Sequence, residues 1–210
     1  MSTKMDVKPR GRPRRYDPEV VLRQGLETFW RKGYAATSVD DLCLATGLNK
    51  PSLYAAWGDK QQWYRQALQV YVKQVGEGMA LALNQARLHD ALEALLRQAV
   101  SLYRDGRGCF MVTTAPSVAW DDDMVRHSMA AALAAQDQAL CARFEQAIAQ
   151  GDAGPAVSAQ GLAVMVSALL HSLALRARVG EPETALLQCG LAGLSGIMAA
   201  ARSGRTSGVQ

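Results

Sequence analysis

The sequence lacks the residue patterns on which metal-dependent and redox proteins depend. Its three histidines are scattered, and no close pair occurs among its four cysteines, Cys43, Cys109, Cys141 and Cys189. Neither set has the spacing of a zinc site or a redox dithiol. No nucleophile–base pair and no phosphate-binding loop can be recognised either. The sequence therefore indicates a non-enzymatic protein with reduced thiols and with neither a metal nor a cofactor.

The chain also lacks a long uncharged apolar run. Its N-terminus is basic, and the longest apolar stretch, at about 161–175, contains His171 and ends at Arg176. A signal peptide or a membrane span would need an apolar segment that neither region provides. We therefore expect a cytoplasmic protein with no membrane partner.

Positive charge is concentrated near the N-terminus. Residues 1–65 contain twelve Lys and Arg against seven Asp and Glu, whereas the remaining residues contain eleven against twelve. A basic excess at one end is typical of a protein that contacts phosphate there. Residues 1–16 have no apolar face and should form a flexible arm. Arg10, Arg12 and Arg14 of this arm are candidates for DNA contact, and a merely solvated arm is the alternative.

Helical periodicity runs through the rest of the chain, without convincing strand alternation. We expect an all-α fold of about nine helices, with a three-helix helix-turn-helix DNA-binding domain at 17–58. A larger helical effector-binding and dimerisation domain should occupy 59–203, followed by a disordered tail at 204–210. After a long helix that begins at about residue 59, further helices are predicted near 89–104, 109–117, 123–149, 158–179 and 183–202. The acidic run at 121–123 fits a helix cap better than a site for a cationic ligand.

Two short helices around a glycine turn carry the functional prediction. Thr37 or Ser38 can cap the first helix, each with an Asp three residues on, and Gly47 ends it. Asn49 can cap the second helix, which continues to about Trp57.

The second of these helices has an inward and an outward face. At 100° per residue, Leu53 and Trp57 point to the same side. Small and hydroxyl-bearing residues on the other side would allow the helix to approach base edges in a major groove. These outward residues are Pro51, Ser52 and Ala55, with Tyr54 on the flank, where it could instead be a packing residue. Lys50 and Lys60 lie at the two ends of the helix, and phosphate contact is the predicted role for both.

Residues 33–68 resemble the helix-turn-helix signature of TetR-type transcriptional regulators. The resemblance rests on the glycine turn, on the Ser-Leu-Tyr at 52–54 and on the Gly-Asp-Lys at 58–60. It implies that the partner is double-stranded operator DNA and that Thr37 or Ser38 and Lys60 contact phosphate. It also implies a recognition surface formed by Lys50, Ser52, Tyr54 and Ala55. In addition, the segment from Arg10 to Arg14 resembles Arg-Gly-Arg-Pro segments that bind the minor groove.

A single helix-turn-helix reads one half of a palindromic operator, so specific binding predicts a homodimer. The last two predicted helices carry apolar stripes beside Gly190, Gly193 and Gly196, and small residues let helices approach closely. We predict that these two helices form the interface with a second copy; packing of the stripes within one subunit is the alternative. The stripe residues are Leu162, Met165, Val166, Leu169, Leu173, Leu187, Leu191, Leu194 and Met198.

The family resemblance also implies a cavity among the middle helices that binds a small-molecule effector. This effector is expected to be a small hydrophobic molecule or a thiol-reactive electrophile. Aromatic, polarizable and polar residues are the candidate linings, although most residues of these kinds are ordinary core. The candidates are Tyr103, Cys109, Phe110, Met111, Thr113, Trp120, Phe144, Met165 and His171.

Cys109 is a candidate sensor residue. It stands at the expected start of a short helix, near Arg104 and Arg107, where the helix dipole and the cations would favour a thiolate. The stretch 108–115 also resembles a segment of a TetR-type subgroup that includes sensors of reactive electrophiles. A buried, inert thiol is the alternative, and we favour it.

The sequence thus predicts a two-state regulator, and repression is the usual outcome in the resembled family. An effector bound in the C-terminal half would move the fourth helix and change the spacing of the two recognition helices. A DNA-binding protein without an effector is one alternative. A helical small-molecule-binding protein is the other, and it would not bind DNA sequence-specifically.

Overall fold

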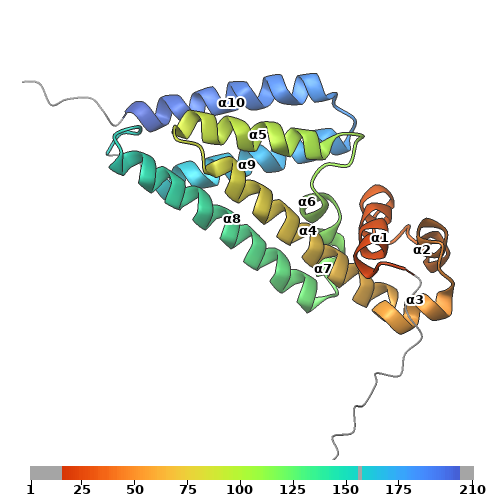
Figure 1. Cartoon of the computed structure of the whole chain (residues 1–210). Helices are drawn as coiled ribbons and strands as arrows, with labels where there is room; N and C mark the ends of the chain where they lie inside the picture. Colours follow the sequence, from red (N-terminus) through yellow and green to blue (C-terminus); the bar gives the residue numbers. More distant parts are fainter. Residues whose placement is uncertain (1–15, 156–157, 204–210) are drawn as a thin grey trace, which may run out of the picture.

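The computed structural model describes residues 16–155 and 158–203. Within these residues the chain forms ten α-helices and no strand, in agreement with the predicted all-α class (Figure 1). Residues 1–15 of the basic arm, with Arg10, Arg12 and Arg14, and the predicted tail at 204–210 lie outside the described residues. Tyr16, the last residue of the predicted arm, is half-buried and packs on Trp57, with ring centroids 5.6 Å apart.

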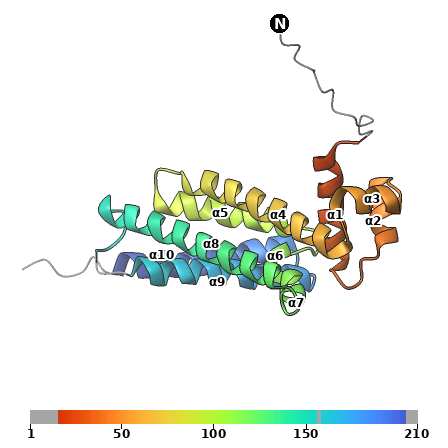
Figure 2. The same ribbon diagram turned by 90° about the horizontal axis from the view of Figure 1, so that it is seen from below.

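Three short helices form a small bundle at one end of the molecule (Figures 1 and 2): α1 (Pro18–Lys32), α2 (Val39–Thr46) and α3 (Lys50–Trp57). Ser38 is the residue that caps α2, because its hydroxyl accepts a hydrogen bond from the Asp41 amide and the Asp41 carboxylate accepts one from the Ser38 amide. This capping box decides between the two candidate caps.

The turn between α2 and α3 uses the residues that the sequence indicated. Gly47 has φ 68°, a left-handed conformation that glycine adopts without a steric penalty, and it ends α2. Asn49 then accepts a hydrogen bond from the Ser52 amide and begins α3. The tight turn fixes α3 against the rest of the small bundle.

The larger domain is a layered bundle of long helices (Figures 1 and 2). In it, α8 packs against α9, α9 against α10, and α10 against α5, while α4 packs against α5 and α8. Because α4 also packs against α1, it joins the two parts of the molecule. The helices are α4 (Lys60–Leu83), α5 (Leu88–Tyr103), α8 (Asp123–Ala149), α9 (Ala159–Arg178) and α10 (Glu183–Ser203).

The helix predicted at 109–117 is in fact two helices, α6 (Phe110–Thr113) and α7 (Ala115–Ala119). They meet at Thr114, whose φ of −122° lies outside the helical range. Pro116 follows at the start of α7, and it has no backbone N–H to continue the hydrogen-bond ladder from α6. The described residues therefore contain ten helices where about nine were predicted.

Buried aromatic rings connect the small bundle to the larger domain. Phe29 and Trp30 of α1 pack edge-on against Tyr64 and Tyr71 of α4, with ring centroids 5.2 and 5.0 Å apart. Both tyrosine rings in turn contact the ring of Phe110 in α6, at 5.3 and 5.5 Å. Such packing makes α1, α4 and α6 parts of one continuous core.

By length and composition alone, α9 and α10 are apolar enough to cross a membrane. Helices in the core of a soluble protein meet the same criterion. In this fold α9 lies between α8 and α10, and α10 packs on α5, so both helices have partners inside the bundle.

Gly25 of α1 allows the close approach of α4. A Cβ atom at this position would lie 2.6 Å from the nearest ring carbons of Trp63, whereas at Gly76 of α4 no described atom lies within 4 Å. We expect Gly25→Ala to lower the free energy of unfolding by about 1–3 kcal/mol through overpacking. Gly76→Ala should raise it by up to about 1 kcal/mol, because alanine has the higher helix propensity. Urea unfolding of both variants measures the difference, and equal effects would contradict the close packing.

Candidate DNA-binding and effector-binding sites

The outward face of α3 is available at the molecular surface. Leu53 and Trp57 anchor the helix from behind, with exposed fractions of 2% and 5%. Trp57 also stacks on Trp63 of α4, with ring centroids 5.4 Å apart. Tyr54 is 49% exposed, so it is not a core packing residue. The face consists of Pro51, Ser52, Tyr54 and Ala55, of which only Ser52 is half-buried.

Lys50 stands at the N-terminal end of this face and pairs with Asp40 of α2. The Lys50 Nζ lies 2.8 Å from the Asp40 Oδ1, and both side chains are at least half exposed. The hydrogen bond to Asp40 and the charge of that carboxylate raise the pKa of Lys50. Exposed ion pairs contribute little free energy, so a phosphate group could take the place of Asp40.

Lys60, at the other end of the face, is held by the loop between α1 and α2. Its Nζ donates hydrogen bonds to the carbonyls of Tyr34 and Thr37, at 3.1 and 3.0 Å, and lies 4.3 Å from the centroid of the Tyr34 ring. A lysine has three N–H donors, so one remains for a phosphate. Thr37 is 1% exposed and its hydroxyl donates to the Gly33 carbonyl, whereas Ser38 is exposed. Of the two predicted phosphate contacts, only the Ser38 side chain is therefore accessible.

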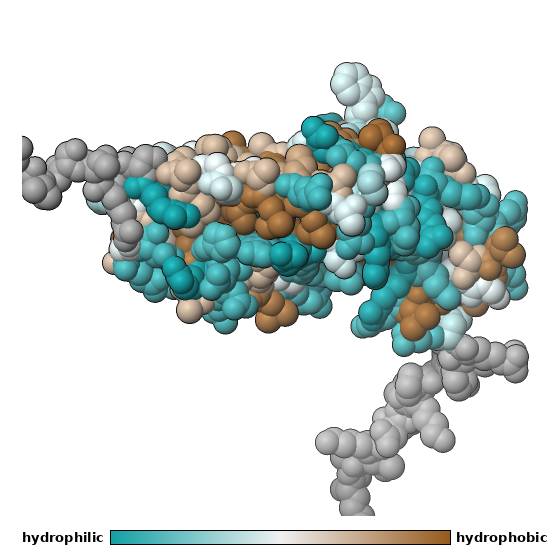
Figure 3. All heavy atoms as spheres, turned by 90° about the horizontal axis from the view of Figure 1, so that it is seen from above, coloured by the Kyte–Doolittle hydropathy of each residue, from teal (hydrophilic) through white to brown (hydrophobic). Residues whose placement is uncertain are grey.

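The outer face of α9 is apolar. Val164, Met165 and Leu175 are 48%, 47% and 53% exposed, and they repeat at helical spacing along this face. The neighbouring α10 exposes the small residues Ala192 and Ser195. Figure 3 shows hydrophobic side chains gathered on the side of the larger domain that α10 covers. We call the exposed apolar residues of α9 and the small residues of α10 the α9–α10 face.

The predicted dimerisation stripes lie only partly on this face. Of the nine residues, Met165 is exposed on α9, and Leu169, Leu187 and Leu191 are half-buried. The other five are buried in the interior of the subunit, where Leu173 lies beside Gly190 of α10. These buried residues are Leu162, Val166, Leu173, Leu194 and Met198.

A cavity of about 540 Å³ lies among α4, α5, α8, α9 and the loop at 104–109. This volume is within the range of small-molecule sites. The cavity contains four of the nine predicted pocket residues, namely Tyr103, Cys109, Met111 and His171.

The remaining predicted pocket residues lie elsewhere. Phe110 and Phe144 are fully buried, because their rings fill the space between helices instead of bordering a void. Thr113 directs its hydroxyl back to the Cys109 carbonyl at 2.8 Å. Met165 lies on the outer face of α9, opposite the interior.

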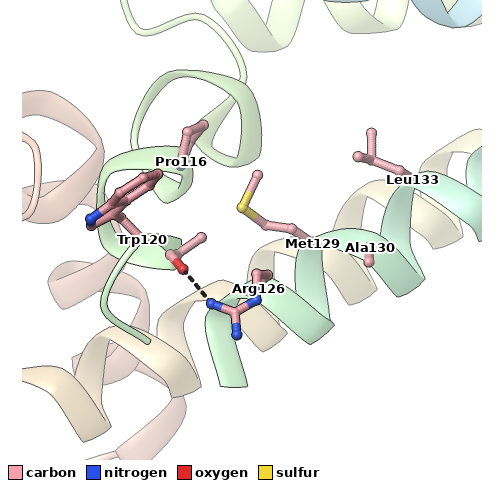
Figure 4. A pocket seen from close by; sticks show the side chains of 7 residues that line it. Pro116, Trp120, Arg126, Met129, Ala130 and Leu133 are labelled. Atoms are coloured by element: carbon pink, nitrogen blue, oxygen red, sulfur yellow. Dashed lines mark hydrogen bonds between the residues drawn. The ribbon is translucent and has the colours of Figure 1, made fainter. Parts of the chain in front are cut away.

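Trp120 is 85% exposed at the end of α7, where the chain turns toward α8. Figure 4 shows its ring beside a shallow surface groove that Met129 of α8 also borders. Arg126 closes one end of the groove by donating a hydrogen bond to the Ala119 carbonyl. Residue type alone indicated a pocket at Trp120, but the groove is distinct from the cavity.

The prediction missed the contribution of α4 and α5 to the cavity. Tyr71, Val75 and Met79 of α4 line it at a spacing of four residues. This spacing is a helical periodicity that was visible in the sequence. Gln98 of α5 and Gln136 of α8 were also missed, because isolated polar residues give no such signal.

Cys109 is not a thiolate in this structure. It is 7% exposed, and the Tyr71 hydroxyl donates a hydrogen bond to its Sγ at 3.1 Å. Burial raises the pKa of the Cys109 thiol, and this effect exceeds the opposing hydrogen bonds. The expectation of a lowered pKa was wrong because α6 has only one turn and the Arg107 guanidinium pairs with Glu27 of α1.

Asp122 links α4 to α8 and confirms the predicted capping role of the acidic run. Its buried carboxylate caps α8 by accepting from the amides of Met124 and Val125, and it also accepts from Arg65 and Gln61 of α4, at 2.8 and 2.9 Å. Burial works to raise the pKa of Asp122, but the bonds from Arg65 and the amides outweigh it and hold the pKa below its usual value of 3.8.

Comparison with known proteins agrees with this architecture. Residues 21–67 match the family described as bacterial regulatory proteins, tetR family, and residues 86–188 match the tetracyclin repressor-like C-terminal domain. The chain is 27% identical over 192 residues to the HTH-type transcriptional repressor ComR of Escherichia coli (strain K12), covering 89% of this chain and 91% of ComR. It is 34% identical over 110 residues to the repressor BdcR of the same organism, covering 52% and 56% of the two chains.

A solved structure of a cysteine-substituted variant of the TetR family regulator CifR, complexed with a 26-base-pair double-strand operator DNA, is also similar. Its TM-score is 0.80 at 28% identity, and the alignment covers 88% of this chain and 98% of that one. The chain therefore belongs to the TetR family of transcriptional regulators, a family of DNA-binding proteins that are not enzymes.

The burial of Cys109 predicts low thiol reactivity. At about pH 7.5, iodoacetamide should modify the half-buried Cys43 at least about tenfold faster than Cys109, because alkylation requires an accessible thiolate. Mass spectrometry of a time course measures both rates in the same sample. Faster modification of Cys109 than of Cys43 would contradict the structure and support the thiolate.

Proposed function

We propose that the chain is an effector-responsive repressor that binds a palindromic operator as a homodimer in the cytoplasm. The observation that carries the proposal is the outward face of α3, which stands exposed on a rigid support of buried Leu53 and Trp57. The names of ComR and BdcR as repressors, and the operator DNA bound to the CifR variant, support it.

In this function α3 enters the major groove. Ser52 and Tyr54 would contact base edges or phosphate, and Ala55 would allow close approach. Ser38, Lys50 and Lys60 surround this face and would contact the phosphates on either side. We further propose that the basic arm with Arg10, Arg12 and Arg14 reaches the adjacent minor groove, where cationic side chains are favoured.

We propose that the α9–α10 face forms the interface of the homodimer. Its half-exposed Val164, Met165 and Leu175 would be buried against a second copy, which gives free energy in proportion to the apolar area removed from water. The small residues of α10 would let the helices of the two subunits approach closely.

The effector would occupy the cavity and act through α4. This helix holds the DNA-binding bundle at its start through Lys60 and lines the cavity with Tyr71 and Met79 further along. A ligand that fits one tilt of α4 better than another shifts the equilibrium between DNA-binding and released forms. We favour reversible binding over thiol modification because Cys109 is buried and its pKa is raised.

The first alternative is a DNA-binding protein without an effector. The cavity of about 540 Å³ argues against this alternative. In a domain that binds no ligand, side chains would be expected to fill such a space. The second alternative is a small-molecule-binding protein that does not act on DNA. The exposed face of α3 argues against this alternative. A protein that does not bind DNA would not need a short helix held with this face toward solvent.

The function is tested by selecting bound sequences from a random DNA pool and measuring affinity against salt concentration. A palindromic site should emerge. Lys60→Ala should weaken binding to every sequence by a similar factor and lower the salt slope by about one, because one phosphate contact is lost. Ser52→Ala should instead change the sequence preference.

Lys73→Ala is the matched control, because Lys73 is 78% exposed on α4 and far along the helix from α3. It should change neither affinity nor slope. A Lys60→Ala variant that loses affinity with an unchanged slope would limit Lys60 to holding the loop between α1 and α2. The absence of any selected sequence would refute the proposed function.

The proposed interface is tested by Val164→Asp with Val20→Asp as the control. The two valines are 48% and 47% exposed, but Val20 lies on α1, away from the α9–α10 face. Val164→Asp should dissociate the dimer, because a buried unpaired carboxylate is costly. Val20→Asp should leave the dimer intact. Sedimentation velocity measures the mass of both, and a dimeric Val164→Asp protein would exclude this face.

A further inference from the structure

The polar part of the cavity lining is positively charged. Arg104 and Arg107 border the cavity from the loop that follows α5, and the described lining contains no Asp or Glu. Gln74, Gln98 and Gln136 add amide groups from three helices, and the Gln136 Nε2 donates a hydrogen bond to the Ser167 hydroxyl at 3.0 Å. The rest of the lining is mainly apolar. A cavity with these walls favours a ligand that combines a negative charge with an apolar body.

Arg107 also contacts the DNA-binding bundle. Its Nη1 lies 2.8 Å from the Glu27 Oε2 of α1, and its guanidinium carbon lies 4.8 Å from the centroid of the Trp30 ring. The Arg107 side chain is 14% exposed and that of Glu27 is 37% exposed, so the pair is half-buried at the edge of the loop. One residue on from it, the Gly108 carbonyl accepts a hydrogen bond from the Trp30 Nε1 at 3.1 Å. The loop therefore touches the cavity on one side and α1 on the other.

Backbone packing holds this loop in place. Gly108 has φ 64°, and a Cβ atom there would lie 2.4 Å from the Ala174 carbonyl oxygen of α9. The backbone at Gly108 cannot move closer to α9. A ligand that reaches Arg107 would therefore move the Arg107 side chain and leave the loop backbone in place.

Glu27 has a second partner. Its Oε1 lies 2.6 Å from the Arg31 Nε on the same helix. If Arg107 turned away, Glu27 would keep this pair, so the cost of losing Arg107 would be reduced. The Glu27 carboxylate therefore stays paired within α1 when Arg107 turns to a ligand, while the contact of Arg107 with α1 is lost.

His171, which lines the cavity, has a polar atom without a hydrogen-bond partner among the described residues. Its Nε2 is buried and has no hydrogen-bond partner in the described part of the chain. Burial lowers the pKa of His171, so the ring is neutral at physiological pH. A buried polar atom without a partner is unusual and gains free energy when a ligand supplies one.

We propose that the effector is an amphipathic organic anion, a carboxylate on an apolar body, whose carboxylate pairs with Arg107 in competition with Glu27 of α1. The inference rests on the proposed function, because it names the ligand class of the same cavity. A carboxylate and a guanidinium form two parallel hydrogen bonds, which a neutral group cannot reproduce. The apolar body occupies the region near Met79, Leu95 and Met111. Loss of the Arg107–Glu27 pair loosens α1, so anion binding and DNA binding oppose each other.

The test uses octanoate and phenylbutanoate as probes, each with its neutral amide of nearly the same shape. Isothermal titration of the full-length protein without DNA measures the dissociation constants. The carboxylates should bind at least about tenfold more tightly than the amides, as expected for a charge-assisted pair. The carboxylates should also release the selected operator, as measured by fluorescence anisotropy.

Two variants act in opposite directions. Arg107→Gln should remove the preference for the carboxylate over the amide. Glu27→Gln should tighten carboxylate binding about threefold or more and leave amide binding unchanged, because the competing anion is gone. Glu93→Gln is the matched control: Glu93 pairs with Arg97 on the exposed side of α5, and this change should have no effect.

The outcomes separate this inference from the proposed function. Equal affinity for the carboxylate and its amide, failure of both carboxylates to bind, or an unchanged preference in Arg107→Gln would overturn the anion assignment. Operator release by the amides alone would overturn it while leaving the regulator intact. Arg107-dependent carboxylate binding by a protein that selects no DNA sequence would support the site and refute the proposed function.

Discussion

The burial of the α1 aromatic rings against α4 is the constraint on which the rest of the molecule depends. Phe29 and Trp30 contact Tyr64 and Tyr71 of α4. These tyrosines contact Phe110 of α6, so the DNA-binding bundle and the larger domain share one hydrophobic core. Because the rings of α1 and α4 are packed against each other, a change in the tilt of α4 must also move α1. In the proposed function, this packing ties the orientation of α3 to the state of the cavity.

Polar contacts at the same junction join specific pairs of helices. The buried Asp122 carboxylate binds Arg65 and Gln61 near the start of α4, and Arg107 binds Glu27 of α1. The Asp122 carboxylate is fully buried, whereas Glu27 is partly exposed and also pairs with Arg31 of its own helix. The first contact fixes α4 on α8. The second contact is the one that borders the cavity and has an alternative, which makes it the point at which a ligand can intervene.

The sequence predicted the elements better than the cavity. Capping residues and glycines are local signals, so α8 has the predicted bounds 123–149 and the turn at Gly47 lies where expected. The break at Thr114 was missed although Pro116 indicated it. Cavity lining depends on how helices meet, so residue type placed Trp120 and Phe144 in a pocket when one is exposed and the other is core. The pKa of Cys109 was likewise decided by burial, which a sequence does not reveal.

The distribution of the tryptophans has a consequence for observing the molecule. Three of the four indoles, Trp30, Trp57 and Trp63, are buried where α1, α3 and α4 meet, and only Trp120 faces water. The intrinsic fluorescence of the chain is thus weighted toward the junction between the helix-turn-helix bundle and the larger helical domain. In the proposed mechanism the two forms of the protein differ at this junction, so tryptophan emission would follow the change without an added label.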